Sequence, residues 1–474
     1  MPRTPPIALP LTEVAPPPRG ASPGLRLTAL ATGFIMAALD VTVVNVAGAA
    51  IQEDLHASLS ELTWIVDGYV LVFSSFLLLG GGLANRLGAK NVYLWGMAVF
   101  FVASLGCALA PNAAVLVGAR LVQGVGAALF MPSSLSLLVL SFPERRERTR
   151  MLGLWSAIVA TSAGLGPSVG GLLVSAFGWQ SIFFLNLPIG IVGILLTRRC
   201  IAEAAIHRVR LAVPGHLLWI AALAALSYAL IEGPRLGWDA GALLVPYAVL
   251  VVAGGALVAR ELRADNLVMP WGLFRRPSFT GANLVGFLFN FALYGSMFML
   301  ALYLQHARGA GALRAGLELL PMTVWFPLAN LVYARISARF SNGTLLTLFL
   351  LVAGIASLTM TTVDSSTPYW TVAVAVGVAN IGAGVISPGM TAALVDSAGP
   401  ENANVAGSVL NANRQIGTLV GIAVMSVVLG TVDDWDSGPA VCFLLVGLAY
   451  LAAAVSAWGL IVRPERPEAV TAKA

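Results

Sequence analysis

The sequence predicts an all-α membrane protein that crosses the bilayer fourteen times, and three observations point to this fold class. Charged residues make up 10% of the 474 residues, whereas soluble proteins contain roughly 25%. Hydrophobic residues make up 58%, and the mean hydropathy is +0.86. Since so few charges cannot cover a soluble surface of this size, we expect most of the chain to face lipid.

The third observation is the spacing of the apolar runs. A membrane-spanning helix needs about 20 mostly apolar residues. The runs of that length between polar breaks lie at 27–50, 62–83, 92–110, 113–140, 151–176, 181–197, 214–232, 240–259, 279–304, 314–335, 343–362, 368–394, 405–430 and 439–461. The expected organisation is a proline-rich disordered tail at 1–24, a six-helix bundle at 25–200, a linker with two extra helices at 201–262, a six-helix bundle at 263–462 and a tail at 463–474.

The positive charges predict the orientation of these spans. If both termini lie in the cytoplasm, the 27 lysines and arginines fall almost entirely on cytoplasmic loops, as the positive-inside rule requires. Only Arg235, Arg308 and Arg314 fall outside, and Arg120 and Arg414 lie within spans. The net charge of +5 is therefore a topology signal, and we expect a lipid bilayer and no nucleic acid as partner.

The same sequence excludes several kinds of chemistry. It contains no glycine-rich phosphate loop with its lysine. The four histidines and three cysteines are scattered without ligand spacing, so we expect no metal, no cofactor and no enzymatic activity. A faint repeat, Gly126-x5-Pro132 against Gly382-x5-Pro388, indicates two related halves, as in secondary transporters.

Five charged residues lie inside predicted spans, where each costs about 2.5–3.5 kcal/mol or more and is a functional candidate by default. They are Asp40, Asp67, Arg120, Glu318 and Arg414. The first four fall in the outward half of the membrane. A carboxyl at position 40 that meets Arg120 in one conformation and loses it in another would bind and release a proton. The alternative is a static buried ion pair, and for Arg414 it is a guanidinium that satisfies backbone carbonyls.

Small residues line one face of the fifth span. Ser162, Gly166 and Gly170 recur every four residues, with Pro167 and Gly171 alongside, so a second helix can approach closely. Proline also removes a backbone hydrogen bond and permits a kink. This face is expected to be either a pivot between moving halves or a plain packing seam.

These segments together resemble the major facilitator superfamily, and within it the fourteen-span drug:proton antiporters of the EmrB/QacA type. The resemblance covers nearly the whole chain from residue 25. It is carried by Leu39-Asp40-x-Thr42-Val43-Val44-Asn45, Trp64-Ile65-Val66-Asp67, Arg120-x2-Gln123-Gly124-x-Gly126, Gly153-x8-Ser162-x3-Gly166-Pro167-x2-Gly170-Gly171 and Trp179-x3-Phe183-x2-Asn186. It implies two six-helix bundles plus two central helices, and it favours the pivot interpretation.

The resemblance has departures as well. In Gly82-Leu83-Ala84-Asn85-Arg86-Leu87-Gly88-Ala89-Lys90, Asn85 stands where the family usually has aspartate and Ala89 where it usually has arginine. This loop is thought to close the cytoplasmic side through its charges, so closure here is expected to be weaker or to use other partners.

The candidate sites follow from these patterns. The proton-coupling candidates are Asp40, Asp67, Arg120 and Glu318. The substrate-binding candidates are Asp40, Asn45, Gln123, Phe287, Phe291, Tyr294, Met297, Phe298, Asn411 and Arg414. The hinge candidates are Gly153, Ser162, Gly166, Pro167, Gly170 and Gly171. The cytoplasmic-gate candidates are Gly82, Asn85, Arg86, Gly88 and Lys90.

We therefore expect a monomeric antiporter of the bacterial cytoplasmic membrane, driven by the proton motive force, that exports lipophilic, cationic drugs or antibiotics by alternating access. A periplasmic adaptor protein would be a further partner if the route extends through a second membrane. One alternative is a dedicated exporter of one natural product or metabolite. The others are a non-transporting membrane sensor on the same fold and, disfavoured by the fifth-span motif, a proton-driven importer.

Overall fold

The computed structural model of the chain describes residues 22–203, 212–263, 271–363, 366–399, 403–432, 434–435 and 437–463. These residues form helices and connecting turns, with no strand among them. The predicted tails at 1–24 and 463–474 lie outside the described residues except at 22–24 and 463. The first helix begins at once, because Ser22 caps it by accepting a hydrogen bond from the backbone N–H of Leu25.

The helices divide into an N-terminal half, an inserted pair and a C-terminal half. The N-terminal half contains α1 (Pro23–Leu55), α2 (Leu59–Leu87), α3 (Ala89–Ala108), α4 (Ala113–Ser141), α5 (Arg145–Phe177), α6 (Ser181–Phe184) and α7 (Asn186–Cys200). The inserted pair is α8 (Val213–Leu236) and α9 (Gly241–Glu261). The C-terminal half contains α10 (Trp271–Phe274), α11 (Pro277–Leu302), η1 (Tyr303–Ala307), α12 (Ala312–Glu318), α13 (Leu320–Thr323), α14 (Trp325–Ile336), α15 (Asn342–Thr359), η2 (Met360–Thr362), α16 (Tyr369–Asn380), α17 (Ala383–Ala398), α18 (Ala403–Thr431), α19 (Ser437–Ala457) and η4 (Trp458–Val462).

Thirteen helices of the described ranges are long and apolar enough to cross a membrane. The remaining predicted span, 314–335, is helical but broken into α12, α13 and α14. Pro321 follows the first break, and a proline removes a helical hydrogen bond and favours such an interruption. The chain continues alongside its neighbours, because α13 packs against α16 and α14 against α17. All fourteen predicted spans are thus helical, and the protein is a multi-pass membrane protein.

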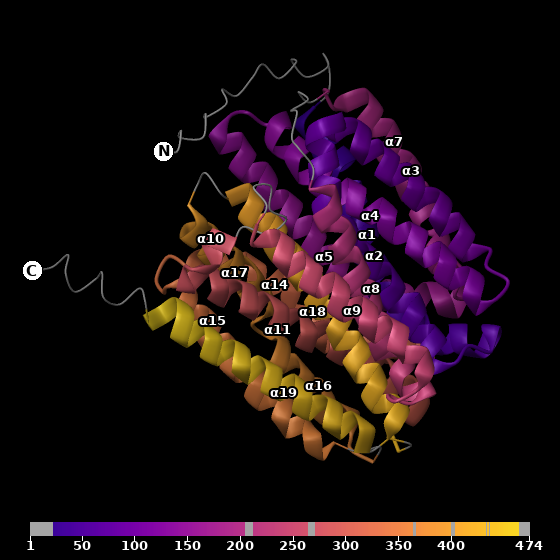
Figure 1. Cartoon of the computed structure of the whole chain (residues 1–474). Helices are drawn as coiled ribbons and strands as arrows, with labels where there is room; N and C mark the ends of the chain where they lie inside the picture. The colour runs from indigo at the N-terminus through magenta and orange to yellow at the C-terminus, as the bar shows by residue number, and fades with distance from the viewer. Residues whose placement is uncertain are drawn as a thin grey trace, which may run out of the picture.

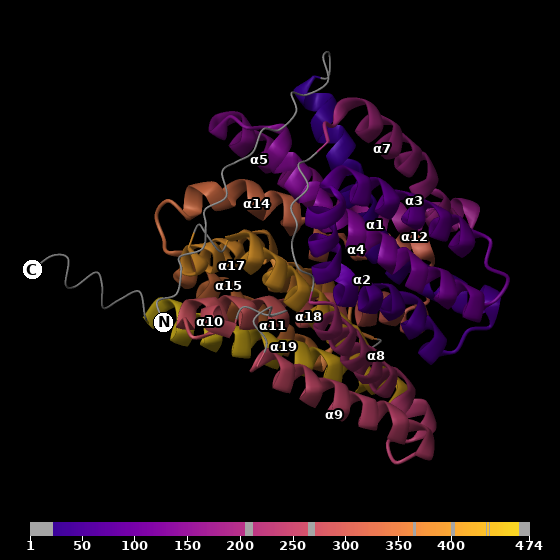
Figure 2. The ribbon, with the colours of Figure 1, turned by 45° about the horizontal axis from the view of Figure 1, so that its top comes forward.

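Both halves have their loops at two ends of the bundle. We call the end where α1 begins and α19 finishes the terminal end, and the opposite end the distal end. Figure 1 shows the N-terminal half in indigo to magenta beside the C-terminal half in orange to yellow. In Figure 2 the inserted helix α9 lies along the outside of the bundle. It packs against α8, and α8 packs against both α2 and α18.

Three hydrogen bonds join the two halves within the described residues, and all lie towards the distal end. Thr63 of α2 and Ser426 of α18 share a hydrogen bond of 2.6 Å. Ser168 of α5 donates to the carbonyl of Gly316 at 3.1 Å. His306 and Gln52 are joined at 3.3 Å. The structure therefore represents a conformation in which the halves are joined at the distal end.

Glu232 fastens the inserted pair to the N-terminal half. Its Oε1 atom accepts hydrogen bonds of 2.8 Å from the hydroxyl of Ser60 and from the indole of Trp64, both on α2. Its Oε2 atom accepts from Arg235 of its own helix. Because the carboxylate is buried and satisfied on both oxygens, α8 is expected to move together with α2.

We predict that Glu232→Ala lowers the free energy of unfolding by about 1–3 kcal/mol, because two donors on α2 lose their acceptor. Differential scanning fluorimetry of the purified protein would show this as a lower Tm. Glu53→Ala, at an exposed position of α1, is the matched control and should leave the Tm unchanged. Equal Tm values for both variants would mean that Glu232 does not fasten α8.

Candidate functional site

A buried ion pair between Asp40 and Arg120 forms the centre of the N-terminal half. Both side chains are almost fully shielded, with 1% and 0% exposed. The Nη1 atom of Arg120 donates to Oδ2 of Asp40 and to Oε1 of Gln123 at 2.7 Å. Its Nε atom donates to the carbonyl of Ile65 at 2.8 Å. Acceptors from α1, α2 and α4 thus meet at one guanidinium.

Asp40 accepts from two further side chains, so its charge is well compensated. Gln123 donates to Oδ1 at 3.0 Å, and Asn186 donates to the same atom at 3.3 Å. Both amides also reach the hydroxyl of Ser104, at 2.9 Å and 3.4 Å. Three side chains, one of them charged, thus donate to the Asp40 carboxyl group. Asn186 and Ser104 are not among the site residues predicted from the sequence, although each is a polar residue within a predicted span.

A glycine permits this arrangement. The guanidinium of Arg120 lies over the ring of Tyr69, 4.4 Å from its centroid, which requires α2 and α4 to be close. A Cβ atom on Gly124 would lie 2.6 Å from the carbonyl oxygen of Tyr69. Only glycine therefore fits at this crossing.

Asp67 is buried without a partner. It is 0% exposed, and neither carboxyl oxygen has a hydrogen-bond partner within the described part of the chain. It lies four residues after Thr63, which bonds to Ser426 of α18, so the spacing puts both on the face of α2 that meets α18. Asp67 is thus at the seam between the halves, separate from the Asp40 ion pair.

Glu318 lies on α12, away from both Asp40 and Asp67. Its Oε1 atom accepts from Arg314 at 2.7 Å, and the Tyr369 hydroxyl donates to its backbone carbonyl at 2.9 Å. Its Oε2 atom is buried and without a partner in the described chain. Because Arg314 is 63% exposed, this pair lies at the distal surface, and the structure does not bring Glu318 together with Asp40.

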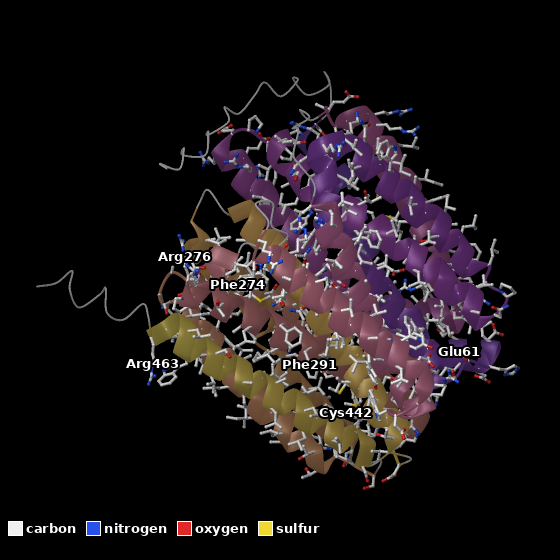
Figure 3. The ribbon with its side chains drawn as sticks, in the orientation of Figure 1. Glu61, Phe274, Arg276, Phe291, Cys442 and Arg463 are labelled. Atoms are coloured by element: carbon white, nitrogen blue, oxygen red, sulfur yellow. The ribbon has the colours of Figure 1, made fainter. Side chains whose placement is uncertain are left out.

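The candidate residues of the C-terminal half lie on α11 and α18. Phe287 and Phe291 are partly buried and stacked, with centroids 6.5 Å apart, and Figure 3 shows Phe291 midway along the bundle. Tyr294 continues this face of α11. Its hydroxyl lies within electrostatic range of Tyr69 in the other half and of Arg414. The aromatic face of α11 thus lies beside Arg414, which is partly buried, since a Cβ on Gly286 would be 3.5 Å from Cγ of Arg414.

Other substrate candidates have structural roles. Met297 and Phe298 are 3% and 2% exposed and belong to the hydrophobic core. Asn45 donates to the carbonyl of Val41 in its own helix at 2.8 Å. Asn411 is partly buried on α18. Its neighbour Asn413 donates to the backbone carbonyl of Asn283 and holds α18 against α11.

The hinge candidates divide into two groups. A Cβ atom on Gly166 or Gly170 would collide with α1, and one on Gly171 would lie 2.5 Å from the carbonyl oxygen of Ala312. The carbonyl of Pro167 likewise leaves no room for a Cβ at Gly316. Gly153 has nothing within 4 Å, and Ser162 bonds to its own helix. Of the hinge candidates, therefore, only those at positions 166–171 lie in the close contact of α5 with α1 and α12.

The gate candidates lie at the terminal end. Gly88, with φ +88°, ends α2 and begins α3, and a positive φ is a conformation that favours glycine. Asn85 and Arg86 are exposed, while Lys90 donates to the carbonyl of Arg198 at 3.4 Å, within the same half. In the described residues these side chains form no hydrogen bond or ion pair with the C-terminal half.

A helical membrane protein with two halves, charged groups at membrane depth and one joined end has the architecture of a transporter. Comparison with known families agrees: the Major Facilitator Superfamily matches residues 30–422 and 327–474. The chain belongs to this superfamily and is a transporter rather than an enzyme.

The relatives are named as resistance and export proteins. The chain is 74% identical over 454 residues to a methylenomycin A resistance protein of Streptomyces coelicolor, a match that covers 96% of each chain. It is 46% identical over 433 residues to a methylenomycin A resistance protein of Bacillus subtilis, covering 91% of this chain and 93% of the relative. It is 33% identical to a tetracenomycin C resistance and export protein of Streptomyces glaucescens, covering 86% and 76%.

We predict that Gly171→Leu separates α5 from α12 and markedly lowers the Tm, because overpacking of a close contact costs about 1–3 kcal/mol. Gly153→Leu is the matched control in the same helix, where the structure leaves space. The two variants would be compared by scanning fluorimetry of protein in detergent. If Gly153→Leu lowers the Tm as much as Gly171→Leu does, the close contact is not at positions 166–171.

Proposed function

We propose that this protein exports an antibiotic of the methylenomycin type in exchange for protons, by alternating access across the bacterial cytoplasmic membrane. The observation that supports proton coupling most directly is the buried Asp40–Arg120 ion pair with its amide partners Gln123 and Asn186. The relative at 74% identity over 96% of both chains supports the cargo. That relative also favours a dedicated natural-product exporter over a broad multidrug exporter.

Asp40 is the proposed proton carrier. In the conformation described, the ion pair and two amide donors favour its ionised form. Protonation removes the charge that Arg120 neutralises, so the guanidinium loses its strongest partner within a buried site. Since an unpaired buried charge costs several kcal/mol, a proton on Asp40 would drive rearrangement of α1 against α4. In this way proton binding is coupled to the conformation of the N-terminal half.

Asp67 is the proposed second proton site. Burying an ionised carboxylate without a donor is costly, and the group avoids this cost by taking up a proton. Asp67 therefore holds a proton in the conformation that is joined at the distal end, whereas Asp40 does not. Because Asp67 lies on the face of α2 that meets α18, separation of these helices at the distal end would expose it to water on the outer side, from which it would take up its proton.

The direction of export follows from the expected orientation. With both termini in the cytoplasm, the distal end faces outward, and the conformation described is closed to the outside. Substrate then enters from the cytoplasmic side or the inner leaflet. Separation of α5 from α12 and of α2 from α18 would open the route outward, and it would break the close contacts that Pro167 and Gly171 make with α12.

We predict that Asp40→Asn abolishes substrate-triggered proton flux, since asparagine cannot exchange a proton. The protein would be reconstituted in liposomes with a pH gradient, and the flux recorded on adding methylenomycin A. Asp239→Asn, at an exposed position near the distal end of α9, removes the same charge and should keep the flux. Undiminished flux in folded Asp40→Asn protein would exclude Asp40 as the carrier.

We predict a different result for Asp67→Asn. Asparagine resembles the protonated acid, so the Tm at neutral pH should equal or exceed that of the unmodified protein, while turnover falls at least about tenfold because one proton site is lost. Scanning fluorimetry and the same flux assay measure the two effects. A Tm several degrees lower would show instead that Asp67 is ionised and has a partner in this conformation.

A further inference from the structure

We propose that the transported substrate carries an anionic group, such as a carboxylate, and that Arg414 of α18 binds it. This inference deepens the proposed function, because it assumes that the substrate binds between the two halves. It differs from the cationic substrate that the sequence favoured.

Arg414 lies deep in the bundle and is partly buried. It is eleven residues beyond Ala403, the start of α18, which at 1.5 Å per residue places it roughly 16 Å from the terminal end. Its Nε atom is buried and has no hydrogen-bond partner in the described residues. No hydrogen bond joins it to a described backbone carbonyl, which disfavours the carbonyl-satisfying role considered for it.

No described carboxylate is available as its counter-ion. Neither α11 nor the rest of α18 contains a charged residue. Asp40 is paired with Arg120, and Asp396 of α17 is exposed in the last turn of that helix. Among the helices packed against α11 and α18, this leaves Asp67 of α2 as the one buried acid without a partner.

Asp67 is too far along the seam to fill this role. The bond between Thr63 and Ser426 fixes the relative heights of α2 and α18. The two helices run in opposite directions. Four residues from this bond towards the terminal end, Asp67 of α2 is level with Ile422 of α18. Arg414 lies eight residues nearer the terminal end than Ile422. The two side chains are thus about 12 Å apart along the helix axis. In this conformation the positive charge of Arg414 is uncompensated within the described chain.

The surroundings of Arg414 suit an organic anion with an apolar body. Gly286 of α11 lies beside it, since a Cβ there would be in ordinary van der Waals contact with its Cγ atom, at 3.5 Å. The partly buried rings of Phe287 and Phe291 are stacked on the same helix, and the Tyr294 hydroxyl lies within electrostatic range. A guanidinium with a free edge, a phenol and two aromatic rings match a negative head on a lipophilic body.

The test measures binding and needs no proton gradient. Full-length protein in lipid-free detergent would be titrated calorimetrically with 2-naphthoate, 2-naphthylmethanol and 2-naphthylmethylammonium, which share one apolar ring system and differ in head charge. We expect naphthoate to bind at least about tenfold more tightly than the alcohol, as hydrogen bonds to a charged group require, and the ammonium compound to bind most weakly. Equal binding of the three compounds, or preference for the cation, would overturn the proposal.

Matched variants assign the effect to position 414. Arg414→Gln should erase the preference for naphthoate and leave the alcohol's Kd unchanged, while Arg414→Lys should keep most of the preference. Arg275→Gln removes one arginine at an exposed position and should behave as the unmodified protein. If Arg414→Gln does not fold, the lysine variant and the comparison of the three probes still test whether Arg414 binds the anion. A preference for naphthoate that persists in folded Arg414→Gln protein would show that Arg414 does not bind the anion.

The same experiments also distinguish a lipid ligand at Arg414 and separate the anion site from the proposed proton coupling. If Arg414 instead binds an anionic lipid headgroup, added phosphatidylglycerol abolishes naphthoate binding and phosphatidylcholine does not, which contradicts the proposal. If proton flux is absent from liposomes while Arg414-dependent anion binding is present, the proton coupling fails and the anion site stands. Proton flux without a preference for the anion would support the proton coupling and overturn the anion site.

Discussion

The buried ion pair of Asp40 and Arg120 is the constraint on which the N-terminal half depends. A bilayer offers no water to a charge at this depth, so each charged group needs partners from the protein itself. Here α1 supplies the acid, α4 the base and one amide, and α7 the second amide. Removing one member leaves a buried charge unpaired at about 3–5 kcal/mol, so these helices hold one register as long as the pair exists.

Where no ion pair joins two helices, close contact between their backbones holds them together instead. Helices in lipid gain little from burying apolar side chains against one another, so packing of small residues decides which helices stay together. In the C-terminal half, Gly417 and Gly421 of α18 press against the carbonyls of Phe287 and Phe291 of α11. This contact fixes the height of Arg414 relative to the aromatic face. Between the halves, the contact of Gly171 with α12 has the same character.

Much of the fold and part of the candidate site were predictable from the sequence, because apolar runs and charged residues are visible in it directly. Fourteen apolar runs and the distribution of arginines predicted the spans. Charge inside a span singled out Asp40 and Arg120, and the resemblance of Arg120-x2-Gln123-Gly124 to a family motif singled out Gln123. Three-dimensional packing determined the rest. Glu318 is as polar and as deep in sequence terms as Asp67, yet Arg314, one turn before it in the same helix, pairs with it at the distal surface. Helical periodicity likewise could not separate Phe298, which is core, from Phe291, which is partly exposed.

The two halves differ in electrostatic balance, and this difference suggests how they share the work. The N-terminal half holds a neutral ion pair that a proton can break, whereas the C-terminal half holds Arg414 without a described partner. If an anion leaves the cell on Arg414 while a proton enters on Asp40, both movements transfer charge in the same direction across the membrane. The membrane potential, worth about 2.3 kcal/mol per charge at 100 mV, then drives both steps, whereas exchange of a monovalent cation for one proton would gain nothing from it. An uncompensated arginine is therefore an energetic advantage for an exporter that works against a concentration gradient.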